Sequence, residues 1–263
     1  MARVRSPAVA GSFYPAAAPV LAQQVDHFVE RAPACQATRP AAFIVPHAGY
    51  VYSGPVAASA YACLRQLRGQ VRHVLLLGPC HFVPMHGLAH PDADALRTPL
   101  GDVPLDDVLL ERAEATHHVL PSSLAHHREH SLEVQLPFLQ RVLGDFDVLP
   151  LVVGTASAEE VADVLDTLWM EDVLPIISSD LSHSLPYETA RKVDQDTARH
   201  ILELDGPLDD ERACGATAIN GLLHVARRRG LRAELLDLRN SGDTAGDRRQ
   251  VVGYGSFAFY ADA

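Results

Sequence analysis

The sequence has few basic residues, no long apolar run and no closely spaced pair of cysteines. Its 263 residues include 22 Lys and Arg against 33 Asp and Glu, which gives a formal net charge of −11. Because a phosphate backbone is bound by clustered Lys and Arg, this charge argues against nucleic acid as a partner. No stretch approaches the roughly 20 apolar residues of a membrane span, and residues 1–7 lack the apolar core of a signal peptide. We therefore expect a cytoplasmic protein that binds neither nucleic acid nor a membrane.

The four cysteines, Cys35, Cys63, Cys80 and Cys214, are widely scattered. Without a Cys-x-x-Cys pair, neither a zinc knuckle nor a disulfide framework is predicted. A single cysteine can still be a metal ligand. The 14 histidines are a large number for a chain of this length, so only their placement separates ligands from surface residues.

The length suits one large α/β domain over residues 1–263, because no linker, repeat or low-complexity segment divides the chain. Short apolar runs alternate with helical patterns, which is typical of a three-layer α/β/α fold with a mostly parallel or mixed central sheet. Strands are expected at 41–46, 71–77, 147–154, 173–177, 233–238 and 251–260. Helices are expected at 21–29, 53–67, 105–115, 132–142, 157–169, 187–204 and 214–230, with loops and short strands over 86–105.

Three of the expected strands run directly into a histidine. His47 and His81 follow the first two strands, and Asp180 and His183 follow the strand at 173–177. In parallel sheets, ligands bind in the crevice beyond the carboxyl ends of the strands. One histidine in such a place is more often structural than functional, but three equivalent placements favour a common site.

Cys214 is expected at the start of a helix, where free N–H groups and the helix dipole favour the thiolate, the form that binds metals. The alternative is that it is a small buried residue beside Gly215. Cys80 directly precedes His81, and adjacent residues on an extended chain point in opposite directions. We therefore favour His81 over Cys80 as a ligand.

Two imidazoles and one anionic ligand leave coordination positions open, as in non-haem iron enzymes, and a thiolate as the third ligand also suits copper or zinc. His183 would act as acid or base, with Asp180 orienting it or a bound water, unless Asp180 only caps the local turn. A histidine-rich segment, residues 117–131, could provide a second ligand set, a lid that contacts substrate, or a polar surface loop.

Several motifs, in order along nearly the whole chain, resemble the Memo family, whose prokaryotic members are also called AmmeMemoRadiSam system protein B. They are residues 9–15 (VAGSFYP), 46–50 (PHAGY) with 52–54 (YSG), 129–138 (EHSLEVQLPF), 178–183 (SSDLSH), 213–215 (ACG), 240–243 (NSGD) and 252–254 (VGY). The resemblance implies an α/β domain similar to the class III extradiol dioxygenases, which cleave catechol rings with Fe(II).

In Memo-like proteins, two histidines and a cysteine replace the two histidines and glutamate of the dioxygenases. By resemblance the metal ligands are His47, His81 and Cys214, and the missing carboxylate argues against ring cleavage. The catalytic histidine matches His183, while Asp180 and His130 match further pocket residues. The family further implies iron or copper-dependent redox chemistry, binding of phosphotyrosine peptides in animals, and association with AMMECR1-like and radical-SAM proteins.

Three functional hypotheses follow. The first is an Fe(II)-dependent oxidoreductase, with copper or zinc as alternative metals, which acts on a small aromatic or polar substrate. The second is a non-catalytic module that binds a peptide or protein in the remnant of a dioxygenase pocket. The third is a zinc-type hydrolase in which His183 or Asp180 transfers the proton.

Overall fold

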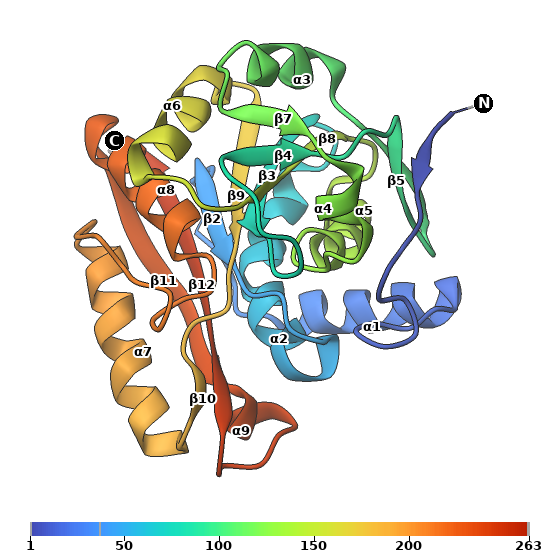
Figure 1. Ribbon diagram of the computed structural model, residues 1–263. Helices are drawn as coiled ribbons and strands as arrows, with labels where there is room; N and C mark the ends of the chain where they lie inside the picture. The colour runs from blue at the N-terminus through green and yellow to red at the C-terminus, as the bar shows by residue number, and fades with distance from the viewer. Residues whose placement is uncertain (1, 37, 262–263) are drawn as a thin grey trace.

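Four parallel strands form the centre of a mixed sheet in the computed structural model, which describes residues 2–36 and 38–261 (Figure 1). These strands lie in the order β2 (Ala42–Val45), β9 (Val173–Ser178), β3 (His73–Pro79) and β8 (Asp147–Val153). Beyond β2 lie β12 (Val251–Ala261), β11 (Leu231–Asn240) and β10 (His183–Leu185); beyond β8 lie β4 (Leu88–His90) and β7 (Val119–Pro121). The predicted α/β class with a mixed sheet is confirmed.

Helices cover both faces of this sheet, because side chains along each central strand alternate between two apolar cores. In β3, Val74 and Leu76 enter one core, whereas Leu75 and Leu77 enter the other. The first core is closed by α1 (Ala18–Arg31), α2 (Tyr50–Tyr61) and α5 (Leu136–Leu143). The second is closed by α3 (Asp107–Glu114), α6 (Ala158–Leu168), α7 (Tyr187–Leu202) and α8 (Ala216–Arg228).

Shorter elements complete the chain. A small separate sheet joins β1 (Val4–Arg5), β5 (Ala95–Thr98) and β6 (Gly101–Pro104), which agrees with the short strands expected over 86–105. The histidine-rich segment contains α4 (Ser123–His127), and α9 (Ser241–Thr244) precedes β12. Within the ranges that the structure describes, no helix is long and apolar enough to cross a membrane.

The helix after His47 begins earlier than predicted. The sequence predicts Ser53 and Pro55 in its first turn, but α2 starts at Tyr50 and contains both. The Ser53 hydroxyl instead donates to the carbonyl of Ala48 at 2.9 Å. Gly54 lets α1 approach, since a Cβ there would lie 2.5 Å from the Phe28 ring. The 3₁₀ turns η1 (Ala62–Leu67) and η2 (Glu133–Gln135) replace parts of the helices expected over 53–67 and 132–142.

The prediction of no disulfide is wrong for one pair of cysteines. Cys35, in the loop after α1, is bonded to Cys63 of η1, with their Cα atoms 5.1 Å apart. The pair is separated by 28 residues and meets because α1 packs against α2. Spacing along the chain therefore gave no signal of this pairing. Cys80 and Cys214 are free thiols.

Candidate metal centre

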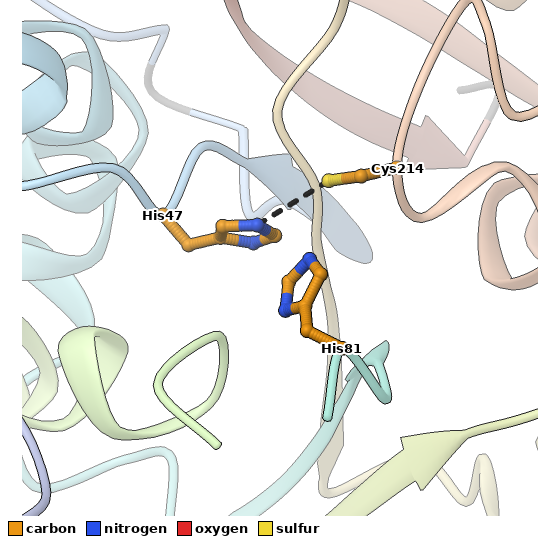
Figure 2. A group of neighbouring side chains, drawn as sticks. All are labelled: His47, His81 and Cys214. Atoms are coloured by element: carbon orange, nitrogen blue, oxygen red, sulfur yellow. Dashed lines mark hydrogen bonds between the residues drawn. The ribbon is translucent and has the colours of Figure 1, made fainter. Parts of the chain in front are cut away.

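His47, His81 and Cys214 come together at the carboxyl end of the central strands (Figure 2). His47 and His81 each follow the end of a parallel strand, β2 and β3, and only β9 lies between these strands. Cys214 comes from the segment that precedes α8. One ligand atom from each residue lies within 4.8 Å of the others.

The spacing of these atoms fits a metal ion. Cys214 Sγ lies 3.3 Å from His47 Nε2. Two ligands bonded to a metal at about 2.0 and 2.3 Å in a near-tetrahedral arrangement would be about 3.5 Å apart. The types of ligand also suit a transition metal, because imidazole and thiolate both bind zinc, copper and iron.

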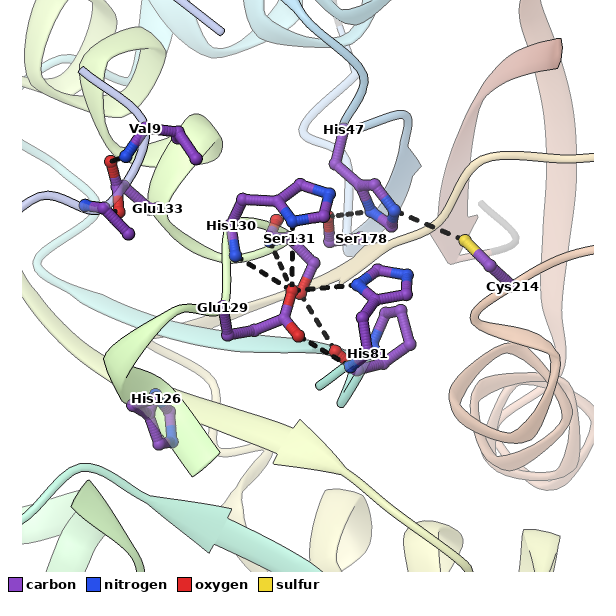
Figure 3. A network of polar contacts seen from close by, with 12 residues as sticks. Val9, His47, His81, His126, Glu129, His130, Ser131, Glu133, Ser178 and Cys214 are labelled. Atoms are coloured by element: carbon purple, nitrogen blue, oxygen red, sulfur yellow. Dashed lines mark hydrogen bonds and ion pairs between the residues drawn. The ribbon is translucent and has the colours of Figure 1, made fainter. Parts of the chain in front are cut away.

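The orientation of His47 is fixed by a chain of hydrogen bonds behind its ring (Figure 3). Its Nδ1 lies 2.9 Å from the hydroxyl of Ser178, the last residue of β9. That hydroxyl donates its one proton to the carbonyl of Ser131 at 2.6 Å and accepts from the amide of Gln135 at 2.8 Å. Since a hydroxyl has a single proton, His47 must donate from Nδ1, which leaves the lone pair of Nε2 facing Cys214.

Glu129 orients His81 in the same way. Its carboxylate accepts the backbone N–H of His81 at 2.7 Å and the ring Nδ1–H at 2.9 Å. It also accepts the backbone N–H groups of His130 and Ser131, both at 2.9 Å. Burial alone would raise the pKa of Glu129, but the bonds from His81 and Ser131 lower it to about 2. Glu129 is therefore a buried anion that leaves Nε2 of His81 free as a ligand.

Protonation at this site differs from what the sequence predicts. Burial, and then the nearby charge of Asp180, raise the pKa of the Cys214 thiol to about 12. The expected preference for the thiolate is therefore wrong without a bound cation. Cys214 lies just before α8, and burial disfavours the charged thiolate more than the helix dipole stabilises it. A bound cation would reverse this, because metal coordination deprotonates a thiol. Burial, and then the neighbouring His81, lower the pKa of His47 to about 3, so this imidazole is in the neutral form that binds metals.

The three predicted catalytic residues surround this group at different depths. Asp180 is buried, its carboxylate accepts the backbone N–H of His47 at 2.7 Å, and burial raises its pKa. The His130 ring stacks on His81, with centroids 4.9 Å apart and planes at 10°. His183 lies on β10, with an exposed side chain whose charge contributes to lowering the pKa of His47.

The histidine-rich segment separates into structural and site residues. His130 belongs to the site, and together with His81 and Glu129 it forms a second group of closely spaced ligand atoms. His126 is buried and lies 2.8 Å from the carbonyl of Ala89 through Nε2, which is a structural role. His117 and His127 are exposed.

Sequence reasoning missed Glu129 and Ser178 as site residues. Each lay in a motif that was singled out, but a residue behind a ligand carries no spacing signal of its own. Glu129 stands in a polar run, between Arg128 and His130, that gives no sign of burial. Acidic residues are rarely buried unless they are paired, so only the burial of Glu129 in the folded chain indicates that it has a partner such as His81.

His126 makes the stability of the fold sensitive to mild acid. Burial lowers the pKa of His126 from 6.5 to about 4. The unfolded chain therefore binds a proton between pH 6.5 and 4 that the folded chain does not, and the free energy of unfolding falls as the pH drops through this range. His126 alone should contribute about 3 kcal/mol to that loss. Denaturant unfolding of the His126→Gln variant should show a shallower decline, whereas the exposed His127→Gln variant should follow the wild type. Equal slopes in all three proteins would contradict this.

Comparisons with known proteins agree with one another. A family model described as "Memo-like protein" matches residues 5–258. The MEMO1 family protein of Aquifex aeolicus is 38% identical over 269 residues, which cover 96% of this chain and 97% of the relative. The one from Archaeoglobus fulgidus is 37% identical over 274 residues, with coverage of 97% and 99%. The crystal structure of an uncharacterized protein from Escherichia coli K12 superposes with a TM-score of 0.57 at 13% identity, covering 82% of this chain and 98% of the other, and shows a shared fold.

Proposed function

The chain belongs to the Memo family, and from that premise we propose that it is a metal-dependent oxidoreductase whose metal is held by His47, His81 and Cys214. The observation that carries the proposal is the convergence of these three ligand atoms within 4.8 Å. Iron is the first candidate metal and copper the second. A set of two neutral imidazoles and one anion leaves positions open for a substrate and suits both metals.

The surrounding residues support a pre-organised centre. Ser178 and Glu129 hold the two rings by their Nδ1 atoms, at 2.9 Å each, so both rings offer Nε2. Asp180 fixes the backbone of His47. Such partners behind the ligands are expected to raise metal affinity, because the ligands need not reorient on binding.

His183 and His130 have separate roles in this proposal. His183, at the exposed edge of the site, exchanges protons between solvent and a bound substrate as acid or base. His130 forms a wall of the site against His81 and Phe13, with ring centroids 4.9 and 4.6 Å apart. Bound iron or copper would supply the one-electron redox chemistry that these side chains lack.

Oxygen consumption tests this function. Protein loaded with iron, copper or zinc would be supplied with ascorbate as electron donor in an oxygen electrode, with chelator-treated protein as background. The iron or copper form should consume oxygen and the zinc form should not, and Cys214→Ser should abolish the activity. His183→Ala should lower the rate about 100-fold or more while metal content stays the same. Anaerobic hydrolysis by the zinc form, with no oxygen consumption by the others, would contradict the proposal.

A further inference from the structure

A pocket of about 490 Å³ opens directly beside the metal centre. Three segments line it: residues 79–85 at the end of β3, 153–156 at the end of β8, and 210–218 around the start of α8. His81 and Cys214 both belong to its lining. A small molecule in this pocket would therefore contact the side of the site on which the two ligands lie.

The polar lining of this pocket is acidic and hydroxylic. It contains the carboxylate of Asp210 and the hydroxyl groups of Thr155 and Thr217, and no Lys or Arg is found among the described residues that line it. Two other surface pockets differ, because Arg side chains line both of them: Arg3, Arg5 and Arg128 in one, Arg249 in the other. The side chains of this pocket thus offer an anionic ligand no basic partner.

Asp210 is free to bind a ligand. Its side chain is exposed, and in the described part of the chain it takes part in no ion pair. The nearest basic residue along the chain, Arg212, is already paired with Asp196 at 2.7 Å. An unneutralised carboxylate at the rim of a pocket attracts a cation, and because this one is exposed to water the attraction is modest.

Apolar side chains also line this pocket. Val83, Pro84 and Met85 form one side, and Ala156 and Ala218 lie among the other residues. Met85 adds a flexible, polarizable thioether, which adapts to ligands of varied shape. The pocket therefore offers a few apolar contacts beside a carboxylate and two hydroxyl groups, which suits a molecule with a small apolar part and a positively charged end.

We propose that this pocket binds small organic amines as the substrates of the metal centre, with Asp210 as the residue that selects for the ammonium group. The inference rests on the proposed function and specifies its substrate class. The apolar body lies against Met85 and its neighbours, and the hydroxyl groups of Thr155 and Thr217 accept or donate further hydrogen bonds.

Three probes of similar size test the selection by charge: 2-phenylethylamine, 2-phenylethanol and 3-phenylpropanoate. Calorimetry with metal-loaded protein at low salt should show that the amine binds about threefold to tenfold more tightly than the alcohol, and the carboxylate least tightly. The preference should shrink at high salt, where exposed charges are screened.

Two variants test whether the preference for the amine comes from Asp210. Asp210→Asn should remove the advantage of the amine and leave the affinity for the alcohol unchanged. Glu211→Gln removes the same charge from an exposed neighbour outside the pocket lining and should change nothing. Equal binding of amine and alcohol by the wild type, or equal effects of both variants, would overturn the inference. Metal content measured on the same samples separates the claims: full metal without amine preference overturns only this inference, and absent metal overturns the proposed function.

Discussion

Replacing Cys214 with serine is expected to lower the metal affinity of the protein about 100-fold or more. Loss of a residue behind a ligand typically costs about 10- to 100-fold, and Cys214 is proposed as a ligand itself. A serine hydroxyl is far harder to deprotonate than a thiol and is a poor match for copper or iron in this set. Competition with a chromophoric chelator would measure the affinity.

The other free cysteine provides a matched control. Cys80 directly precedes His81, but its thiol bonds to the carbonyl of Val83 at 3.2 Å and lies outside the ligand group. Cys80→Ser should therefore bind metal like the wild type. Cobalt-loaded wild type and Cys80→Ser should both show a thiolate-to-metal charge-transfer band that Cys214→Ser lacks. A band that persists in Cys214→Ser would contradict the ligand assignment.

Among the residues that hydrogen-bond to the ligands, Glu129 is expected to show the largest loss of stability and metal affinity when it is replaced by alanine. The Glu129→Ala change leaves four N–H groups near His81, His130 and Ser131 without their acceptor. Breaking a buried charged interaction of this kind costs about 3 to 5 kcal/mol of unfolding free energy. His81 also loses the group that fixes its ring, so metal affinity should fall about 10- to 100-fold.

Glu133→Ala separates the loss of stability from the loss of metal affinity. Glu133 is also buried, but its carboxylate binds Arg5, the Tyr14 hydroxyl at 2.6 Å and the backbone N–H groups of Ala8 and Val9, away from the two metal-binding rings. This variant should lose comparable stability in denaturant unfolding. Its metal affinity, measured below the unfolding transition, should stay within about threefold of the wild type. Equal losses of affinity in both variants would show that Glu129 acts only through stability.

Much of the fold could be predicted from the sequence because its strands are short, continuously apolar and separated by periodic helices. The Ser157 capping box placed the start of α6 correctly, since local hydrogen bonding alone decides that position. The start of α2 was misjudged because Ser53 and Pro55 have good local reasons to begin a helix, whereas a tertiary bond from the N–H of Tyr50 to Phe13 places the first turn earlier. The bond between Cys35 and Cys63 also depends on packing.

The site was predictable only in part. Strand ends indicated His47 and His81, but the sequence does not show that β9 alone separates β2 from β3. Cys214 reaches the site from a distant segment. Its place near a helix start allowed either a ligand or a small buried residue, and the family resemblance indicated it as the third ligand. Its high pKa could not be foreseen, because burial is a property of the folded chain.

Metal content by mass spectrometry tests the central claim most directly. The protein would be purified anaerobically without an affinity tag, together with the His47→Ala and Cys214→Ser variants. The wild type should contain nearly one equivalent of iron or copper, and both variants should lose it while remaining folded. Metal that stays unchanged in the variants, or a wild type that binds no metal even after reconstitution, would contradict the proposed centre.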